Sequence, residues 1–434
     1  MNAAFKNNLL KFDLKEPQCR KLHRDYLNTR RVTESLCKPL SAEDYTIQSM
    51  PDVSPPKWHL AHTAWFFETF ILAKVFYNYR HFNPSFNYLF NSYYKGVGAH
   101  YPRTQRGLLS KPNTVEVYNY RHFVDAHIEI FFNEATELEW KEFGKVLEMG
   151  IHHEQQHQEL LMMDILHNFH SNPLKPHYLE QRHSKSTHIA PALTWFDYSE
   201  DLYEIGTNSE DFSYDNERPR HRTFIEDFRL ASRLVTNAEY LKFVEDSAYH
   251  HPLLWLSDAW DHIQKKNWKA PLYWENRDGE WWQMTLRGSQ KLDLEAPVCH
   301  LSFYEAEAYA RWAGKRLPRE SEWEVVAQDT NPEGNFLESR TFKTQVSPEQ
   351  SLSSPAQLWG DAWEWTQSSY SPYPRFKALT GDLGEYNGKF MSNQMVLRGG
   401  SCVTPETHIR ASYRNFFPPW SRWQFSGIRL AEDL

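Results

Sequence analysis

The 434-residue sequence is poor in the features that mark secreted or membrane-spanning proteins. It has four scattered cysteines (Cys19, Cys37, Cys299 and Cys402), none in the C-x-x-C spacing of thiolate zinc sites. A disulfide framework is therefore not expected, and a reducing cytoplasm fits best. No 18-residue apolar run occurs, and the first residues lack the apolar core of a signal peptide. We therefore expect neither a membrane span nor secretion.

An excess of charge of one sign is also lacking. The formal net charge is −8, and Lys and Arg are interspersed with Asp and Glu. No basic stripe is present, so we expect no nucleic-acid partner. Hydrophobic residues make up 40% of the chain and aromatic residues 15%, which is enough for sizeable cores. The length favours at least two domains.

The character of the sequence changes near residue 170. Segments 61–76 and 135–169 carry apolar residues at three- and four-residue steps, whereas 51–56 and 84–112 hold the turn-formers. Residues 1–170 therefore predict an antiparallel four-helix bundle with long connections. Residues 171–191 are polar and punctuated by proline, as in a linker. Residues 192–434 combine short strand-like pieces with few helices, the best at 302–312, and predict an irregular α+β domain.

The segment His152-His153-Glu154-Gln155-Gln156-His157 carries the clearest chemical signal. It places His153 and His157 four residues apart on a predicted helix, so both imidazoles project from one face. Two imidazoles at this spacing can converge on one metal ion. Surface or purely structural histidines also occur at this spacing, but apolar residues surround the pair and favour a site in a bundle core.

The same letters spell H-E-x-x-H, the pattern of zinc metalloproteases, in which Glu154 would be the base. The extended form of that pattern needs glycine at 160 and histidine at 163, which here are Leu160 and Met163. A glutamate ligand about 20 residues further on would be Glu180, which lies in the predicted linker. The metalloprotease is therefore only a remote alternative, and Glu154 is expected to have no catalytic part.

A third histidine from another helix completes the site better. His59 and His62 both lie at the start of the predicted helix that contains Trp65 and Phe66. His62 is the stronger candidate because it continues the apolar face of that helix. A site of three imidazoles with open positions holds either Zn²⁺ or Fe²⁺, and the ligand count does not choose between them.

These residues match known families. The first half, with SPPKWHLAHTAWFFETF and HHEQQHQEL, resembles the DinB-like metal-binding bundle. The second half resembles the formylglycine-generating-enzyme-like (sulfatase-modifying) domain, a variant of the C-type lectin fold. Its motifs are FSYDNERPRH (212–221), LVTNAEYLKF (234–243), the segment 297–324, WGDAWEWT (359–366) and VLRGGSC (396–402). In this order, and with RNFFPPWSRWQFSGIRLA at 414–431, the chain resembles the ergothioneine-pathway sulfoxide synthases, also called hercynine oxygenases.

The resemblance implies an oxidoreductase with a non-haem Fe²⁺ cofactor held by His62, His153 and His157. Such enzymes consume O₂ and join the thiol of cysteine or γ-glutamylcysteine to the imidazole C2 of hercynine (Nα-trimethylhistidine), giving a sulfoxide. The residues agree with this chemistry. Three neutral ligands leave the metal its full charge and open positions, and a metal-bound thiol is deprotonated.

The family also implies residues that hold the substrates. Arg103 and Arg106 match an R-x-x-R that grips the carboxylate of the thiol substrate, for which the planar guanidinium fork is suited. Gln156, directly before His157, corresponds to a glutamine on the hercynine side. Outside the family resemblance, both arginines would be interpreted as solvated loop charges and Gln156 as a polar bundle residue.

Aromatic faces suit a trimethylammonium group, because a cation is attracted to the ring quadrupole. Phe416 and Phe417 can supply such faces, and the neighbouring Asn415 can donate to a carboxylate.

The reaction also needs an acid, for which the family uses a tyrosine. Tyr93 and Tyr94, upstream of the arginine pair, are the first choice, and Tyr370 and Tyr373 are the second. Either pair could instead consist of ordinary packing tyrosines.

Three alternatives share parts of this pattern and can be compared with it. A formylglycine-generating enzyme needs a cysteine pair shortly after R-G-G-S, but Thr404 and Ile409 occupy those positions, and Cys402 is expected to be a small buried residue. Ovothiol-pathway synthases share both domains but usually add a methyltransferase after the point where this sequence ends. A non-catalytic lectin-like module would not explain the histidines. The choice of thiol, and whether the protein forms a homo-oligomer, stay open.

Overall fold

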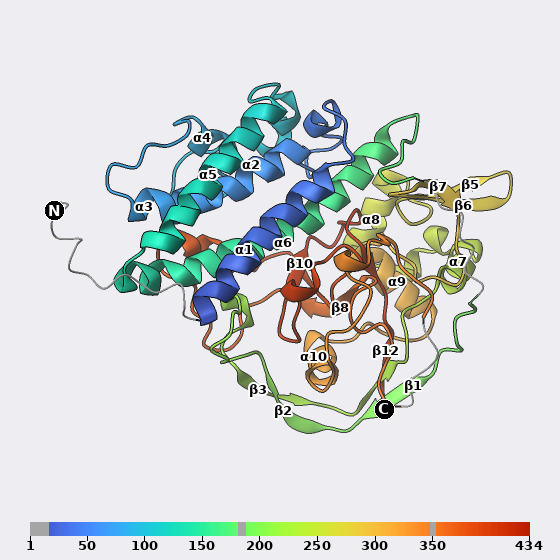
Figure 1. The fold of residues 1–434 in the computed structure, drawn as a ribbon. Helices are drawn as coiled ribbons and strands as arrows, with labels where there is room; N and C mark the ends of the chain where they lie inside the picture. Colours follow the sequence, from blue (N-terminus) through green and yellow to red (C-terminus); the bar gives the residue numbers. More distant parts are fainter. Residues whose placement is uncertain (1–16, 181–187, 348–352) are drawn as a thin grey trace. The chain divides into compact units, whose positions relative to one another are not determined.

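The computed structural model describes residues 17–180, 188–347 and 353–434. The chain divides into two units, Met1–Asn168 and Phe169–Leu434. Long helices dominate the first unit, whereas short strands, short helices and loops dominate the second (Figure 1). Among the helices of the described residues, none is long and apolar enough to cross a membrane.

Four long helices make up most of the first unit. They are α1 (Pro17–Cys37), α2 (Pro56–Phe67), α5 (Thr114–Glu134) and α6 (Glu137–Ser171). A π-helical turn (Glu68–Leu72) joins α2 to α3 (Ala73–Val75), and α4 (Phe86–Phe90) lies in the connection to α5. The helix expected at 61–76 begins earlier because a proline opens it, and a proline ring already has the helical φ.

Side-chain caps in the sequence explain where other helices begin. Asn113 and Glu116 form a reciprocal capping box at the start of α5, and Ser302 and Glu305 form one at the start of α9 (Phe303–Trp312). Each box satisfies two backbone N–H groups that the first turn of a helix leaves unpaired. The helix predicted at 302–312 is thereby confirmed, with Ser302 as its N-cap.

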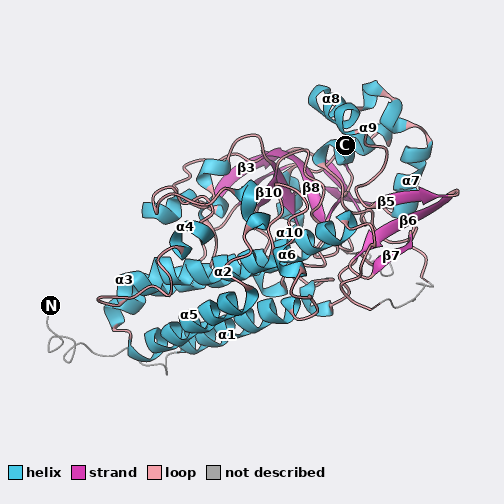
Figure 2. Ribbon diagram, turned by 90° about the horizontal axis from the view of Figure 1, so that it is seen from above, coloured by secondary structure: helices cyan, strands magenta, loops and turns pink. Residues whose placement is uncertain are grey.

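The second unit is an α+β domain built from small sheets, as predicted (Figure 2). Its other helices are α7 (Asn237–Glu245), α8 (Ser257–Lys266) and α10 (Glu320–Gln328). Its strands are β1 (Trp195–Tyr198), β2 (Asp201–Ile205), β3 (His221–Ile225), β4 (Phe228–Ala231), β5 (Trp274–Arg277), β6 (Glu280–Thr285), β7 (Gly288–Lys291), β8 (Trp363–Ser369), β9 (Met395–Arg398), β10 (Asn415–Phe417), β11 (Ser426–Gly427) and β12 (Ala431–Asp433).

The strands of the described residues pair in four sheets, in the orders β1-β4-β12, β10-β9-β8-β11, β2-β3 and β5-β6-β7. All pairs are antiparallel except β8 with β11. Strand β8 lies in the core, where Trp363 and Trp365 are at most 1% exposed. Glu364, between them, receives two hydrogen bonds of 2.8 Å from the buried guanidinium of Arg429. Tertiary pairing therefore satisfies a carboxylate that the core strand buries.

Part of the predicted linker packs onto the second unit. Tyr178 is 5% exposed, and the backbone N–H groups of Tyr178 and Leu179 donate to the carbonyl of Leu286 between β6 and β7. The middle of the predicted linker, residues 181–187, lies outside the described residues.

Candidate metal centre

The segment His152–His157 lies within α6, a helix of 35 residues. At 3.6 residues per turn, His157 and Asp164 lie about 40° and 20° around the helix from His153, so the three share one stripe. Glu154 lies about 100° away from His153 and faces another part of the bundle. The helix thus separates the histidines from the glutamate that the protease pattern would need beside them.

A glycine lets α2 approach α6 next to this stripe. A Cβ atom added at Gly150 would lie 2.4 Å from the ring of Phe67 and 3.1 Å from that of Phe66. The aromatic rings of α2 therefore occupy the space that any side chain at this position would need. One turn further along α6, the ring of Phe66 lies 4.7 Å from that of His153. This approach places His62, one turn before Phe66, against the α6 stripe.

Three histidines converge in the core of the first unit. Each of His62, His153 and His157 offers a ring nitrogen, and these three atoms all lie within 4.8 Å of one another. The ring centroids are 4.6–4.9 Å apart, and the side chains are buried, with residue exposures of 1%, 2% and 8%. Among the described residues, this is the one group of three metal-ligating side chains that could hold an ion. The structure therefore brings together the three histidines that the sequence selected.

The environment keeps these imidazoles neutral, which is the form that binds metals. Burial lowers the pKa of His153 to about 3. Burial and the neighbouring His153 lower the pKa of His62 well below its usual value, and the same two causes act on His157. Protons therefore compete little with a cation for the three ring nitrogens.

The backbone and two indoles orient His62. Its Nδ1 lies 2.6 Å from the carbonyl oxygen of Phe90, so this nitrogen is the donor and Nε2 is left for a metal. The rings of Trp58 and Trp65 stack on the His62 imidazole, with centroid distances of 4.4 and 5.4 Å and interplanar angles of 15° and 14°. No sequence pattern indicated this stacking, although both indoles lie within four residues of His62.

The other histidine considered for the third position, His59, lies behind the cluster. Its Nδ1 is 2.9 Å from Nδ1 of His157, and its Nε2 is 3.0 Å from a carboxylate oxygen of Asp164. Both nitrogens of His59 are thus engaged, and it is His62, not His59, that faces His153 and His157. Sequence reasoning missed Asp164, although its position seven residues after His157 is a helical repeat that could have indicated it.

Glu154 is a structural residue. It is fully buried and accepts hydrogen bonds of 2.8 and 2.9 Å from Arg30 and Arg121 of the neighbouring helices. Burial alone would raise its pKa, but the two guanidinium groups lower it to about 2. This geometry speaks against a metalloprotease, whose base must reach the metal-bound water.

The structure separates the two arginines of the R-x-x-R pattern. Arg103 is exposed and donates to the backbone carbonyl of Asp52. Arg106 is 3% exposed, donates to the hydroxyls of Ser54 and Ser92, and keeps a buried Nε without a partner. No carboxylate of the described residues forms an ion pair with Arg106. Burial and nearby Arg103 lower its pKa well below the usual value.

Arg106 belongs to the same stack of rings as the cluster. Its guanidinium lies 3.4 Å from the centre of the Trp58 indole, whose other face carries His62. The two groups must lie on opposite faces of the Trp58 indole, because at these distances the guanidinium and the imidazole would overlap on one face. Around this stack, Lys57, Phe90, Leu109, Pro112 and Val117 line a small pocket together with Trp58 and Arg106. The pocket holds a cation that lacks an acidic partner, which is what an anion site requires.

The candidate tyrosines fall into two environments. Tyr94 is fully buried, its ring lies 5.7 Å from that of Trp65, and it stacks on the half-buried Tyr93 at 4.6 Å. One indole therefore separates Tyr94 from His62. Tyr370 and Tyr373 belong to the second unit. The Tyr370 hydroxyl accepts from Asn216 at 2.8 Å and that of Tyr373 from Arg398 at 3.0 Å, as expected for packing residues.

The residues predicted to hold hercynine lie on two elements. Gln156 is half-buried on α6, directly before His157. Asn415, Phe416 and Phe417 form β10 of the second unit and are all half-buried. One face of the Phe416 ring is covered by Tyr370, with ring centroids 4.1 Å apart.

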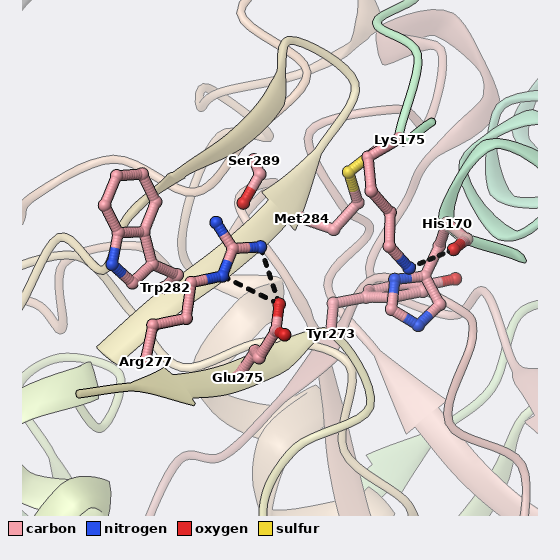
Figure 3. Close-up of a pocket in the computed structure, with 8 residues that line it drawn as sticks. All are labelled: His170, Lys175, Tyr273, Glu275, Arg277, Trp282, Met284 and Ser289. Carbon is pink, nitrogen blue, oxygen red and sulfur yellow. Dashed lines mark hydrogen bonds and ion pairs between the residues drawn. The ribbon is translucent and has the colours of Figure 1, made fainter. Parts of the chain in front are cut away.

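A separate hollow of the second unit was not predicted (Figure 3). Its empty volume is about 220 Å³ with open solvent included, and it is lined by His170, Lys175, Tyr273, Glu275, Arg277, Trp282, Met284 and Ser289. Its charges are already engaged, since Arg277 pairs with Glu275 at 2.6 Å and Lys175 donates to the carbonyl of His170. It therefore offers less for a ligand than the histidine cluster does.

Comparisons with known proteins agree with this two-part architecture. The DinB superfamily matches residues 26–161, which include the three histidines. Hercynine oxygenases of Mycolicibacterium smegmatis and Mycobacterium tuberculosis are 35% and 33% identical to this chain over 52% and 53% of its length. These alignments cover 58% of each relative, so the chain spans little more than half the length of the curated relatives it matches.

A formylglycine-generating enzyme of Streptomyces coelicolor is also similar, with 27% identity over 52% of this chain and 84% of that protein. At the two positions where we expect the cysteines of such an enzyme, this chain has the buried residues Thr404 and Ile409. Cys402, between R-G-G-S and these positions, is fully buried, as predicted. The sulfatase-modifying factor enzyme 1-like domain matches residues 202–356 and 338–434, more than half of the chain, and the chain therefore belongs to this family.

Proposed function

We propose that this protein is a non-haem iron(II) sulfoxide synthase of ergothioneine biosynthesis. In this reaction O₂ is consumed, and the thiol of cysteine or γ-glutamylcysteine becomes joined to C2 of the hercynine imidazole as a sulfoxide. The observation that carries the proposal is the buried convergence of three neutral imidazoles. The likeness to hercynine oxygenases supports the choice of reaction.

The three histidines fit Fe²⁺ by their chemistry. Imidazole is a suitable ligand for iron, and three of them leave coordination positions for substrates. Bound there, Fe²⁺ would lower the pKa of a thiol and pass electrons from the substrates to O₂. The four electrons that O₂ accepts come from the C–S coupling and from the oxidation of sulfur to the sulfoxide, two from each. The protein's part is to keep His62, His153 and His157 deprotonated and oriented before any ligand arrives.

Arg106 binds the carboxylate of the thiol substrate. A buried guanidinium that forms no ion pair is costly, because two hydroxyl groups and the Trp58 ring replace only part of its lost hydration. A substrate carboxylate in the adjoining pocket would supply the missing partner and the acceptor for its buried Nε. Arg103, exposed and bonded to a backbone carbonyl, contributes positive potential at longer range.

Tyr93 and Tyr94 donate a proton during the reduction of O₂ and regain it from the substrates, because the hydrogens of the thiol and of the imidazole C2 balance the water that forms. The place of Tyr94 one indole away from His62 supports this role over that of Tyr370 and Tyr373, whose hydroxyls hold neighbouring side chains. Hercynine, which accepts the sulfur at its C2, is bound by Gln156 next to the cluster.

In the second unit, the candidates for binding hercynine are residues of strand β10. Phe416 and Phe417 present ring faces to the trimethylammonium group, and Asn415 donates to the carboxylate. A cation–π contact of this kind contributes about 0.5–2 kcal/mol.

The test is an O₂-uptake assay of the Fe²⁺-loaded protein with product masses. Hercynine and histidine are each combined with cysteine and with γ-glutamylcysteine, and each substrate is also supplied alone. We expect O₂ uptake and a C–S-coupled sulfoxide with hercynine and one of the thiols. Product with histidine instead of hercynine would point to an ovothiol-type synthase. Absence of coupled product in every arm contradicts the proposal, as does full turnover by a His62→Ala protein.

A further inference from the structure

A second pair of polar residues lies behind the histidine cluster. His59 and Asp164 are 2% and 3% exposed. The chain of contacts runs from His157 Nδ1 to His59 Nδ1 at 2.9 Å, and from His59 Nε2 to Asp164 Oδ2 at 3.0 Å. The same Asp164 oxygen also accepts from the backbone N–H of Ser54 at 2.7 Å. Each link has hydrogen-bond length in a region from which water is excluded.

The protons in this chain can be assigned from its two ends. A carboxylate only accepts, so Nε2 of His59 carries the hydrogen that points to Asp164. In a neutral His59 ring, Nδ1 is then a bare acceptor. The hydrogen between the two rings therefore belongs to Nδ1 of His157. This leaves the lone pair of His157 on Nε2, the nitrogen that is free to bind a metal.

We infer that Asp164 and His59 are positioning residues that fix the tautomer and the orientation of His157 and raise the affinity of the cluster for a divalent cation. The inference rests on the proposed function only in taking His62, His153 and His157 as a metal site. A metal-binding histidine usually gives its second N–H to a carboxylate, a carbonyl or water. Here an intervening imidazole transmits the effect of the carboxylate.

Charge gives the arrangement a second effect. Three neutral ligands compensate none of the charge of a buried cation, and the nearby guanidinium of Arg106 adds to it. Asp164 is the carboxylate joined to the ligand set by hydrogen bonds, and it makes His157 a better electron donor. His62 differs, because its Nδ1 donates to the uncharged carbonyl of Phe90. The ligands are thus oriented by unlike acceptors, and removing Asp164 should affect His157 and not His62.

The experiment measures Co²⁺ affinity by chelator competition, together with the visible absorption of bound Co²⁺, on the full chain without substrates. The variants are His59→Leu, His59→Gln and Asp164→Asn. Leucine removes both hydrogen bonds, whereas the glutamine amide can accept from His157 and donate to Asp164. Asparagine keeps an oxygen acceptor and removes only the charge. Circular dichroism and the melting temperature of each metal-free protein report whether the fold is retained.

We expect His59→Leu to bind Co²⁺ about 10–100-fold more weakly and to change its absorption spectrum. His59→Gln should recover most of the affinity, and Asp164→Asn should fall between the two. Wild-type affinity and spectrum in a folded His59→Leu protein would overturn the inference. Equal losses in His59→Leu and His59→Gln would also overturn it. Side-chain volume would then control binding, and not the hydrogen-bonded relay from Asp164 through His59 to His157.

The outcomes separate this inference from the proposed function. If the wild-type protein binds Co²⁺ and the His59 variants behave as expected, but the Fe²⁺-loaded protein makes no coupled product, only the proposed function fails. If coupled product forms but the variants bind Co²⁺ like the wild type, only the relay fails. A wild-type protein that binds no Co²⁺ contradicts the metal site and therefore both.

Discussion

Buried histidines in the two units have similar acidities but different surroundings. His153 in the first unit and His300 in the second are 2% and 3% exposed, and burial lowers the pKa of each to about 3. His300 is fixed by the carbonyl of Gln424 and packs against Tyr273 and Phe425, whereas His153 meets two further imidazoles. A depressed pKa therefore does not single out a candidate metal ligand, whereas convergence with other imidazoles does.

Buried charges show the same contrast. In the second unit, Arg398 pairs with Glu324 at 2.8 Å and Arg429 with Glu364 at 2.8 Å, so each guanidinium has an acid from the same core. Beside the histidine cluster, Arg106 has hydroxyl partners and no ion pair with the described residues. In a matched pair each charge compensates the other, and losing one partner destabilises the fold, whereas a buried charge without an ion pair offers a place for a ligand.

The contrast between the histidines of the two units depends on metal binding by the cluster of the first unit. We expect His153→Ala to lose Co²⁺ and Fe²⁺ affinity by more than the roughly 100-fold that the loss of an outer partner costs. Metal content after dialysis, measured by mass spectrometry, checks this. His152→Ala is the matched control. Position 152 lies about 100° around the helix from His153, so this variant should keep its metal. Equal losses in both variants would indicate unfolding and not the loss of a ligand.

The second prediction concerns the loss of stability when one partner of a buried ion pair is removed. Arg398→Met should lower the free energy of unfolding by about 3–5 kcal/mol, because it leaves Glu324 buried without its cation. Urea unfolding followed by circular dichroism measures the loss. Arg106→Met strands no acid and should lower the free energy of unfolding by less than about 1 kcal/mol, because removal of a buried charge offsets the loss of its hydroxyl contacts. Comparable losses in the two variants would show that the contrast between the units is wrong.

Arg106→Met should instead affect substrate binding. Loss of a charge-assisted contact of about 1.5–3 kcal/mol predicts a KM for the thiol roughly 10–150-fold higher, with metal content unchanged. Steady-state kinetics with each thiol tests this. Arg103→Met serves as the control, since its exposed guanidinium should change KM less. A larger effect at Arg103 would reverse the roles given to the two arginines.

The smallest effect is a pH dependence in the second unit. The folded pKa of His300, about 3, is below the unfolded value near 6.5, so its contribution to stability is complete above pH 6.5 and declines as the pH falls towards 3. His300→Asn removes this titration, and asparagine tolerates the positive φ of 65° at this residue. Between pH 7 and pH 5 the difference in unfolding free energy between wild type and variant should change by roughly 2 kcal/mol. A constant difference would contradict the assigned pKa.

Much of the architecture follows from local patterns. The apolar periodicity predicted the helical first half, Ser302 and Glu305 marked the start of α9, and the motifs of the second half predicted its family. The start of α2 was misplaced because Pro56 and the apolar residues after it extend the helix backwards. Within the predicted helical bundle, the segment that forms α1 was not identified as a separate helix from its sequence.

The candidate site also has a part that sequence spacing predicts and a part that only packing decides. Spacing within one helix placed His153 and His157 together, because the helical period is fixed by backbone geometry. The partners of these residues come from elsewhere: His62 and His59 from α2, Phe90 from α4, and Trp58 between His62 and Arg106. Only the packing of α2 on α6 at Gly150 decides which histidine meets the cluster and which lies behind it.

The sequence by itself determined the fold class, the two-part order and the pairing of His153 with His157 on one helix face, since these depend on periodicity and on residue types with few alternatives. Tertiary structure alone decided that Glu154 is held by Arg30 and Arg121, that Arg106 is buried without an ion pair among the described residues, and that Asp164 reaches His157 through His59. The reason is physical: hydrogen bonds and desolvation depend on which side chains meet in space, and residues more than 100 positions apart leave no local signal of that meeting.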